Sequence, residues 1–310
     1  MTEFLGYTST VGMNVLILFI MIAVGFIISK KNLINADGAA QITNILLYLV
    51  TPCVIINSFE SMELSEKSVG DLIVAVICAC VTHLVGFSIS FLIFRKNEKK
   101  LRTILINTAT LSNCGFMGIP MADALLGSHG VFLTSVYIAV FNVFVWTISY
   151  SMFSGGKFSI KKAILNPGVL STLLGLIIFF TKVQFPNIIE SPVRYIAGVN
   201  SPLAMIVIGF YLSATPLKIT KDDSKMFLSL ALRLLAVPLI CLALFRFAGV
   251  RGNLLTACII SAAAPTAALV MMFAAKSGYG TQLASKAMAY SYIFSIVTMP
   301  LILTVCQMLI

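Results

Sequence analysis

The chain has 310 residues, of which 59% are hydrophobic and only 10% are charged. Soluble domains usually carry about 25% charged residues, because their surface must be mainly polar. The composition therefore excludes an ordinary soluble domain and predicts an all-α polytopic membrane protein. The net charge of +10 does not predict nucleic-acid binding, because the basic residues follow the membrane topology instead of forming one patch.

Stretches without Asp, Glu, Lys or Arg predict where the chain crosses the membrane. About 20 apolar residues in a helix span the roughly 30 Å apolar core. Nine stretches are long enough, and a tenth becomes long enough if its helix begins near Met226 and tolerates Arg233. The ten stretches are 4–29, 38–59, 72–94, 103–122, 124–156, 163–181, 195–217, 234–245, 252–275 and 287–310. We therefore expect ten transmembrane helices in one membrane domain, 1–310.

The distribution of Lys and Arg predicts the orientation of these helices. If successive loops alternate sides, one set of loops holds 15 basic residues and the other holds 5. The positive-inside bias assigns the first set to the cytoplasm, so both termini are expected to be extracytoplasmic. Lys30 and Lys31 follow the first apolar stretch, the reverse of a signal peptide, so the first helix is expected to be retained in the cytoplasmic membrane.

The chain divides into two halves of five predicted helices, 1–156 and 163–310. With an odd number of helices in each half, two halves of the same fold would have opposite orientations. Two proline pairs recur at similar offsets, namely Pro52 with Pro202, 150 residues apart, and Pro120 with Pro265, 145 residues apart. Inverted repeats with interrupted helices at matching positions are typical of secondary transporters.

The fourth predicted span concentrates amides, hydroxyls, glycines and a proline in the membrane interior. These residues are Asn107, Thr108, Thr110, Ser112, Asn113, Gly115, Gly118 and Pro120. Proline lacks an N–H, so a half-helix is expected to begin near Pro120, and another near Pro265 in the ninth span. Two positive helix ends that meet beside Asn113 and Thr266 would form an anion site without any buried lysine or arginine.

The alternative interpretation is that both segments are proline-kinked helices whose small residues only pack against neighbours. The density of amides and hydroxyls favours a binding site in the fourth span. The ninth-span segment S-A-A-A-P-T-A-A-L-V, 261–270, supports both interpretations equally.

Ionisable side chains within the spans are candidates for ion coupling or charge compensation. Arg233 would either extend to the membrane interface or neutralise an acidic substrate or carboxylate. His83 would either carry a proton or bond to a neighbouring helix. Sodium could be held by oxygens of Thr110, Ser112 and Asn113. Uniport, proton symport and sodium symport are all compatible with these residues.

The segment L-S-N-C-G-F-M-G-I-P-M-A-D-A-L-L-G, 111–127, resembles the fourth-helix motif of the auxin efflux carrier family. This family includes plant auxin carriers and bacterial carriers described as malate or malonate permeases. Similar stretches run nearly from end to end: L-Y-L-V-T-P-C-V-I-I-N-S-F (47–59), F-N-V-F-V-W-T-I-S-Y (141–150), N-P-G-V-L-S-T-L-L-G-L (166–176), S-P-L-A-M-I-V-I-G (201–209), R-L-L-A-V-P-L (233–239), A-A-P-T-A-A-L-V-M-M-F-A-A-K-S-G-Y-G (263–280) and S-I-V-T-M-P-L (295–301).

The resemblance implies inverted five-helix repeats with crossed, broken fourth and ninth helices, an architecture shared with sodium/proton antiporters and bile-acid symporters. It implies a scaffold of helices 1, 2, 6 and 7 and a transport domain of helices 3, 4, 5, 8, 9 and 10. By position, it places substrate contacts at Asn113 and its neighbouring turn, Pro265, Asn142, Trp146, Pro52 and Asn57. The long cytoplasmic loop of the plant proteins is missing between the halves, which leaves auxin without support as the substrate.

The leading hypothesis is alternating-access transport of small organic anions, such as malate, malonate or a related acid. The rival is a sodium-coupled symporter of larger amphipathic anions, similar to bile-acid symporters. A membrane-embedded enzyme or a receptor is disfavoured, because the chain lacks H-E-x-x-H, G-x-S-x-G and an output domain. No catalytic residue, metal or cofactor is predicted. The expected partners are the anion, the lipid bilayer, protons or sodium, and a second copy in a homodimer.

Overall fold

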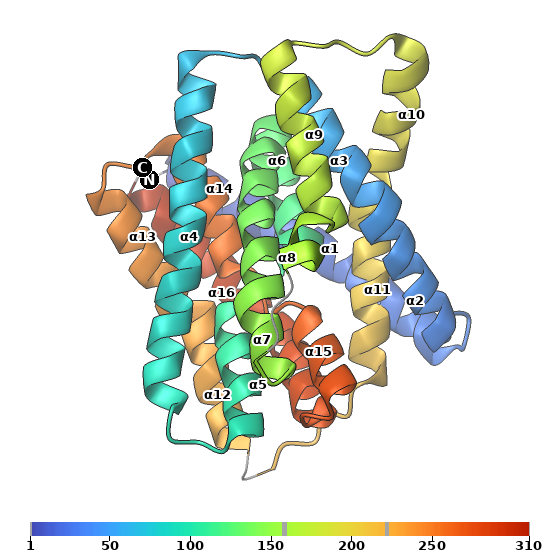
Figure 1. Ribbon diagram of the computed structural model, residues 1–310, viewed down its shortest axis with the longest axis vertical. Coiled ribbons are helices and arrows are strands. Elements are labelled where there is room, and N and C mark those ends of the chain that lie inside the picture. The colour runs from blue at the N-terminus through green and yellow to red at the C-terminus, as the bar shows by residue number, and fades with distance from the viewer. Residues whose placement is uncertain (1, 157–159, 221–222, 310) are drawn as a thin grey trace.

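The computed structural model describes residues 2–156, 160–220 and 223–309, and it is all-helical within them (Figure 1). Residues 157–159 of the expected linker between the halves lie outside the described residues. The α-helices of the first half are α1 (Thr2–Lys30), α2 (Ala36–Ile45), α3 (Thr51–Glu60), α4 (Glu66–Phe94), α5 (Lys99–Thr110), α6 (Ile119–Phe144) and α7 (Tyr150–Phe153). Those that follow are α8 (Ile160–Ile164), α9 (Pro167–Thr181), α10 (Asn187–Gly198), α11 (Asn200–Ala214), α12 (Ser224–Ala231), α13 (Val237–Phe247), α14 (Gly252–Ala263), α15 (Leu269–Ser277) and α16 (Thr281–Met308).

Seven helical segments of the described chain are long and apolar enough to cross a membrane. They are Thr10–Lys30, Ala36–Glu60, Glu66–Phe94, Cys114–Phe153, Asn187–Ala214, Ser224–Phe247 and Thr281–Met308. The sequence predicts ten spans, but only seven of the described helical segments meet the length needed to cross a membrane. Two apolar helices, α9 and α14, are too short by length, and the 40-residue segment Cys114–Phe153 joins two expected spans. The protein is therefore a multi-pass membrane protein.

The joined segment changes direction at Gly127. Its φ of 60° and ψ of −152° are non-helical, and they interrupt α6 between its two halves. This backbone conformation favours glycine, because a side chain would be strained there. Gly127 therefore separates the fourth expected span from the fifth, although the two form one element.

Wide π-helical turns precede three of the prolines. They are η1 (Leu46–Val50) before Pro52, η2 (Cys114–Gly118) before Pro120 and η5 (Leu232–Ala236) before Pro238. In each turn, the residue just before the proline donates its N–H to the carbonyl five residues back. A proline cannot donate to the carbonyl four residues back, so the helix widens by one residue without ending. A fourth π-helical turn, η3 (Val145–Ser149), joins α6 to α7.

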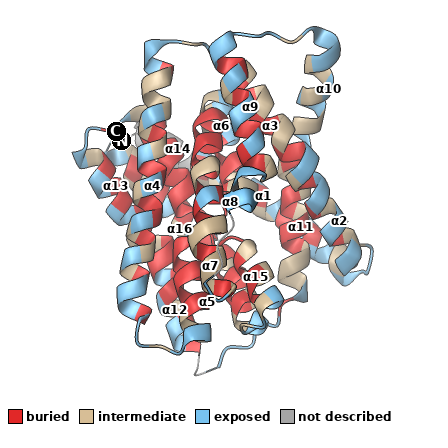
Figure 2. Ribbon diagram, viewed as in Figure 1, coloured by how far each residue is buried: buried red, intermediate tan, exposed pale blue. Residues whose placement is uncertain are grey.

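Buried residues gather along the central helices α6, α14 and α16, whereas the outer faces of α1, α4, α9 and α10 are exposed (Figure 2). Large apolar side chains lie on these exposed faces, among them Ile17, Leu84, Ile177 and Tyr195. An exposed apolar surface of this extent suits contact with lipid, because a bilayer solvates such side chains and water does not.

Helix α1 packs closely against α11 through two glycines. A Cβ added to Gly25 would lie 2.4 Å from the carbonyl oxygen of Ile206, and one added to Gly209 would lie 2.2 Å from that of Ile22. The two backbones therefore touch directly, which only glycine permits and which is a common basis of helix association in membranes.

One end of the bundle, the lower end in Figure 1, contains the connection between α4 and α5 and the one between α11 and α12. We call it the basic end, because Lys96, Lys99 and Lys100 lie there. The opposite end contains the connection between α3 and α4, with Glu63, and we call it the acidic end.

Candidate functional site

Two helices stop in the middle of the bundle, and their broken ends pair with each other. Helix α5 ends at Thr110 before η2 begins at Cys114, and α14 ends at Ala263 before α15 begins at Leu269. The intervening segments 111–113 and 264–268 form an antiparallel bridge between Ser112 and Thr266. The Asn113 N–H donates to the Pro265 carbonyl at 2.7 Å, and the Ala267 N–H donates to the Leu111 carbonyl at 2.9 Å. Backbone groups released by the two breaks are thus satisfied by each other.

The break in the fourth expected span does not lie at Pro120. Pro120 is the second residue of α6, inside continuous helical structure that begins at Cys114. Asn113 caps this beginning, because its Oδ1 accepts the N–H of Phe116 at 3.2 Å. The expectation of a half-helix that begins near Pro120 is wrong by six residues, since the bridge and the asparagine cap set the break and the proline only widens the next turn.

At the break, the N-terminal ends of the helices are partly accessible, whereas the C-terminal ends are buried. Gly115 and Phe116, at the N-terminal end of η2, are half-buried, as are Ala268 and Leu269 at the N-terminal end of α15. A Cβ added to Gly115 would meet no atom within 4 Å, so this position faces open space. The C-terminal ends of α5 and α14, by contrast, are fully buried. Positive helix ends are therefore the accessible part of the break, and negative ends are its sealed part.

Two polar residues of α16 form hydrogen bonds with the paired segments of the break. The side-chain amide of Asn113 donates to the hydroxyl of Tyr292. The N–H of Thr266 donates to Ser291 Oγ at 3.1 Å, and Thr266 Oγ1 donates to the Thr108 carbonyl at 3.2 Å. Ser291 and Tyr292 were not among the predicted site residues, although they form a polar pair in an apolar stretch. That pair is the signal that could have identified them.

Trp146 lies apart from the break, in an aromatic cavity near the basic end. Its ring centroid lies 5.4 Å from that of Phe273 on α15 and 5.7 Å from that of Tyr150. These rings line a cavity of about 200 Å³ together with Lys162 and Lys276. Lys162 Nζ lies 4.6 Å from the centroid of the Tyr150 ring. The cavity thus combines aromatic walls with two ammonium groups.

The other predicted contacts lie elsewhere in the structure. Asn142 donates to the Ile138 carbonyl of its own helix at 3.0 Å, and its amide nitrogen would lie 3.0 Å from a Cβ added to Gly168 of α9. Pro52 and Asn57 are half-buried on α3, which packs against α6, α9 and α10. A Cβ added to Gly118 would lie 3.5 Å from the Cβ of Cys114 and 3.8 Å from Cγ2 of Thr134, which is ordinary van der Waals contact. The structure does not place these residues in the paired segments.

The two ionisable candidates are both buried. His83 is 1% exposed, its Nδ1 shares a hydrogen bond of 2.7 Å with the Ala79 carbonyl of the same helix, and its ring packs against Tyr137, Phe141 and Phe144. Arg233 is 0% exposed and its Nη1 donates to the Thr110 carbonyl at 3.0 Å. The interpretation that Arg233 extends to the membrane interface is therefore wrong, because its guanidinium turns inward to the break.

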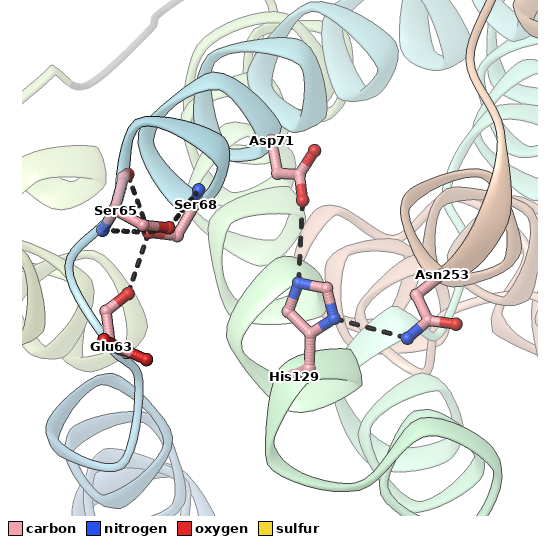
Figure 3. A network of polar contacts seen from close by, with 6 residues as sticks. All are labelled: Glu63, Ser65, Ser68, Asp71, His129 and Asn253. Atoms are coloured by element: carbon pink, nitrogen blue, oxygen red, sulfur yellow. Dashed lines mark hydrogen bonds and ion pairs between the residues drawn. The ribbon is translucent and has the colours of Figure 1, made fainter.

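A separate polar network joins three helices at the acidic end (Figure 3). Asp71 Oδ2 on α4 lies 3.7 Å from His129 Nε2 on α6, and Asn253 of α14 lies 3.4 Å from the other ring nitrogen. Nearby, Ser65 and Ser68 form a capping box at the start of α4. These groups are partly exposed, and exposed pairs of this kind contribute at most about 1 kcal/mol.

The apolar helices, the broken pair in their centre and the accessible positive helix ends define a membrane transport protein. A model of a protein family described as membrane transport proteins matches the chain over residues 10–157 and 154–303. The chain belongs to this family, the auxin efflux carrier family.

Three relatives illustrate the range of similarity. An uncharacterised transporter of Methanothermobacter thermautotrophicus is 26% identical over 306 residues, which cover 96% of this chain and 98% of the relative. An uncharacterised transporter of Methanocaldococcus jannaschii is 24% identical over 217 residues, 66% of this chain and 70% of the relative. Auxin efflux carrier component 3a of Oryza sativa subsp. japonica is 29% identical over 140 residues, 44% of this chain but only 23% of the plant protein.

Proposed function

We propose that the protein is a secondary transporter that moves small organic anions, carboxylates such as malate or malonate, across the cytoplasmic membrane by alternating access. The observation that carries this proposal is the accessibility of the N-terminal ends of η2 and α15, beside Gly115 and Ala268. Each such end offers free N–H donors and about half an elementary positive charge, which suits a carboxylate. Membership of a membrane transporter family supports transport over catalysis.

The proposal includes a ten-pass arrangement of two inverted five-helix repeats, 1–156 and 163–310. The seven long segments, the kink at Gly127, and the short helices α9 and α14 support it. The scaffold would contain α1, α2, α3, α9, α10 and α11, and the remaining long helices would form the transport domain. The excess of basic residues supports a cytoplasmic basic end and extracytoplasmic termini.

The substrate would contact the break and the neighbouring turn of η2. Asn113, Gly115, Pro265 and Thr266 lie at or beside the paired segments, and Pro120 with Gly118 shapes the turns that follow. Pro52 and Asn57, on α3 of the scaffold, would reach the substrate only after the transport domain moves against the scaffold. Asn142 lies on α6 of the transport domain and would move together with the break. Domain movement of this kind is how alternating access exposes a central site to either side.

The aromatic cavity would be the route between the break and the basic end. It is lined by Trp146 and by Phe273 of α15, the helix that begins at the break, and Lys162 and Lys276 lie at its rim. Ammonium groups at the entrance of a low-dielectric cavity raise the local concentration of anions. The aromatic walls also favour the second candidate, a symporter of larger amphipathic anions, because such anions need apolar contact area.

The anion site can be tested by adding one methyl group at Gly115. Because a Cβ there meets no atom within 4 Å, Gly115→Ala should leave the fold intact but occupy space that the anion needs. We expect carboxylate affinity to fall about tenfold, which corresponds to about 1.4 kcal/mol. Binding can be measured by thermal shift of purified protein in nanodiscs, where a ligand at 100 times its dissociation constant stabilises by about 2.7 kcal/mol.

Gly12→Ala is the matched control, because an added Cβ on Gly12 of α1 also meets nothing within 4 Å. It should bind mono- and dicarboxylates as the wild type does. The proposal would be contradicted if no carboxylate stabilises the wild type while a cation or a neutral solute does. If Gly115→Ala and Gly12→Ala bind carboxylates with equal affinity, the substrate does not bind at this part of the break.

A further inference from the structure

Tyr292 lies on α16 behind the break, and its side chain is 0% exposed. Its hydroxyl accepts a hydrogen bond from the side-chain amide of Asn113. Asn113 caps η2, the turn with which helical structure resumes after the first broken segment. A buried tyrosine hydroxyl needs a partner, because an unpaired polar group is costly there. The partner that this one has belongs to the proposed anion site.

The orientation of the Asn113 amide is fixed at both of its ends. Its Oδ1 accepts the N–H of Phe116 at 3.2 Å, and its Nδ2 donates to the Tyr292 hydroxyl. If the amide were turned over, its NH2 group would face the Phe116 N–H, and two donors would oppose each other. The helix cap therefore selects the oxygen end of the amide, and Tyr292 holds the nitrogen end.

The nitrogen end of the Asn113 amide has one donor to spare. An asparagine amide nitrogen carries two N–H groups. Within the described part of the chain, Nδ2 of Asn113 makes one hydrogen bond, that to Tyr292. Asn113 caps the half-buried N-terminal end of η2, where a Cβ added to Gly115 would meet no atom within 4 Å. A second donor is thus left at the helix end where the anion is proposed to bind.

The residue before Tyr292 holds the other broken segment. Ser291 Oγ accepts the N–H of Thr266 at 3.1 Å and donates to the Met288 carbonyl of its own helix at 2.6 Å. Successive residues of a helix point about 100° apart, so a single turn of α16 reaches both segments. Helix α16 also packs against α14 and α15, which flank the break of the ninth expected span. The place of the Tyr292 hydroxyl relative to the break is therefore fixed by several contacts.

We infer that Tyr292 is a positioning residue of the proposed anion site: its hydroxyl holds the Asn113 amide so that one N–H stays directed to the bound carboxylate. The inference rests on the proposed function. Tyr292 is sealed from the site and acts through Asn113, without touching the anion. A donor that is held in advance binds more tightly than one that the ligand must first order, because less conformational freedom is lost on binding.

The first experiment removes the Tyr292 hydroxyl and keeps its ring. In Tyr292→Phe the amide of Asn113 loses the partner of its nitrogen end and can rotate. We expect the affinity for malate and malonate, measured by thermal shift in nanodiscs, to fall about tenfold. An affinity within about twofold of the wild type would overturn the inference.

Tyr290→Phe is the matched control. Tyr290 lies on the same helix, is also buried, and donates its hydroxyl to the Leu217 carbonyl at 2.6 Å. The two variants lose the same atom and one hydrogen bond each, but Tyr290→Phe leaves the break untouched and should bind both acids as the wild type does. Equal losses of affinity in the two variants would show a general effect on α16 and would overturn the inference.

A double-mutant cycle separates positioning from packing. Asn113→Ser keeps a good helix cap but has no amide nitrogen to reach Tyr292. In this background, Tyr292→Phe should change the carboxylate affinity by no more than about twofold, because the group through which Tyr292 acts is gone. A further loss of about tenfold in the double variant would mean that Tyr292 acts independently of Asn113, which contradicts the inference.

The same cycle without ligand separates the inference from the proposed function. If no carboxylate binds the wild type, the proposed function fails, but the melting temperatures of the unliganded wild type, single variants and double variant still report on the pair. Additive changes would overturn the inference, because coupled residues give non-additive ones. Non-additive changes would retain Tyr292 as the residue that positions Asn113.

Asn113→Asp decides the question if Tyr292→Phe does not fold. An aspartate caps a helix as well as an asparagine does, and it can accept the Tyr292 O–H, so the fold should be kept. It has no N–H to offer, so its affinity for malate and malonate should fall by about tenfold or more. Unchanged affinity would show that the anion does not use the amide donor and would overturn the inference.

Discussion

Replacement of Lys286 by Met is expected to lower the free energy of unfolding by about 3–5 kcal/mol, because it leaves Asp223 buried and charged without its ammonium partner. Lys286 Nζ lies 3.0 Å from Asp223 Oδ2, and the side chains of both residues are at most 6% exposed. The pair connects α16 to the segment that leads from α11 into α12. Melting of the purified protein in detergent or nanodiscs measures the effect.

The double variant Lys286→Met with Asp223→Leu is the control for this prediction. A buried ion pair replaced as a whole by apolar residues is often neutral or even stabilising, so most of the lost stability should return. If the double variant is as unstable as the sum of the two single variants, the pair is not coupled and the loss comes from packing. Added salt should change the wild-type value little, because the pair is shielded from solvent.

The same pair predicts a loss of stability in acid. Burial acts to raise the pKa of Asp223, but the Thr220 N–H at 2.7 Å and the Lys286 ammonium outweigh burial and hold this pKa below its usual value. A lowered folded-state pKa stabilises the protein above the unfolded-state pKa of about 3.9, and this stabilisation is lost as the pH falls toward the folded-state pKa. Asp223→Asn should therefore depend less on pH below about 4 than the wild type does.

Replacement of Gly209 by Leu is expected to cost about 3 kcal/mol or more and to reduce the yield of folded protein. A Cβ at this position would lie 2.2 Å from the Ile22 carbonyl oxygen and 2.6 Å from the Phe26 nitrogen. Both neighbours are backbone atoms of α1, so no side chain can rotate away, and α1 and α11 would have to separate. Size-exclusion chromatography with a melting curve measures the result.

Gly12→Leu is the matched control for the Gly209 variant. Gly12 lies on α1, the helix that Gly209 of α11 contacts, but a Cβ added to Gly12 meets no atom within 4 Å. A leucine at this position should therefore be accepted with little change in melting temperature. Equal melting temperatures for the two variants would contradict the direct backbone contact between α1 and α11.

The helices themselves were largely predictable, because they depend on local composition. The apolar stretches 4–29 and 72–94 lie within α1 and α4. Lipid contact needs only a long run of apolar residues, and the sequence shows that directly. The resemblance to the auxin efflux carrier family is likewise confirmed by the family match over residues 10–157 and 154–303. The count of ten spans stays a prediction, since helix length supports seven.

The place of the break could not be predicted from proline alone. Pro265 lies in the break of the ninth expected span, but Pro120 lies beyond that of the fourth. The bridge between Ser112 and Thr266 joins residues 154 positions apart, so its hydrogen bonds are invisible to any local pattern. Pro120 instead widens a turn, which costs less free energy than ending the helix where the chain continues as a helix.

Sequence therefore established the membrane class, the apolar helices and the polar fourth span, because each of these depends on neighbouring residues in the chain. Tertiary structure decided which polar groups face open space and which are sealed. Gly115 is accessible while Thr110 is not, although they lie only five positions apart in the chain. Arg233 is directed to the Thr110 carbonyl, 123 residues away, and not to the membrane interface. Such choices depend on which helices meet, because the electrostatic and hydrogen-bonding partners come from distant segments of the chain.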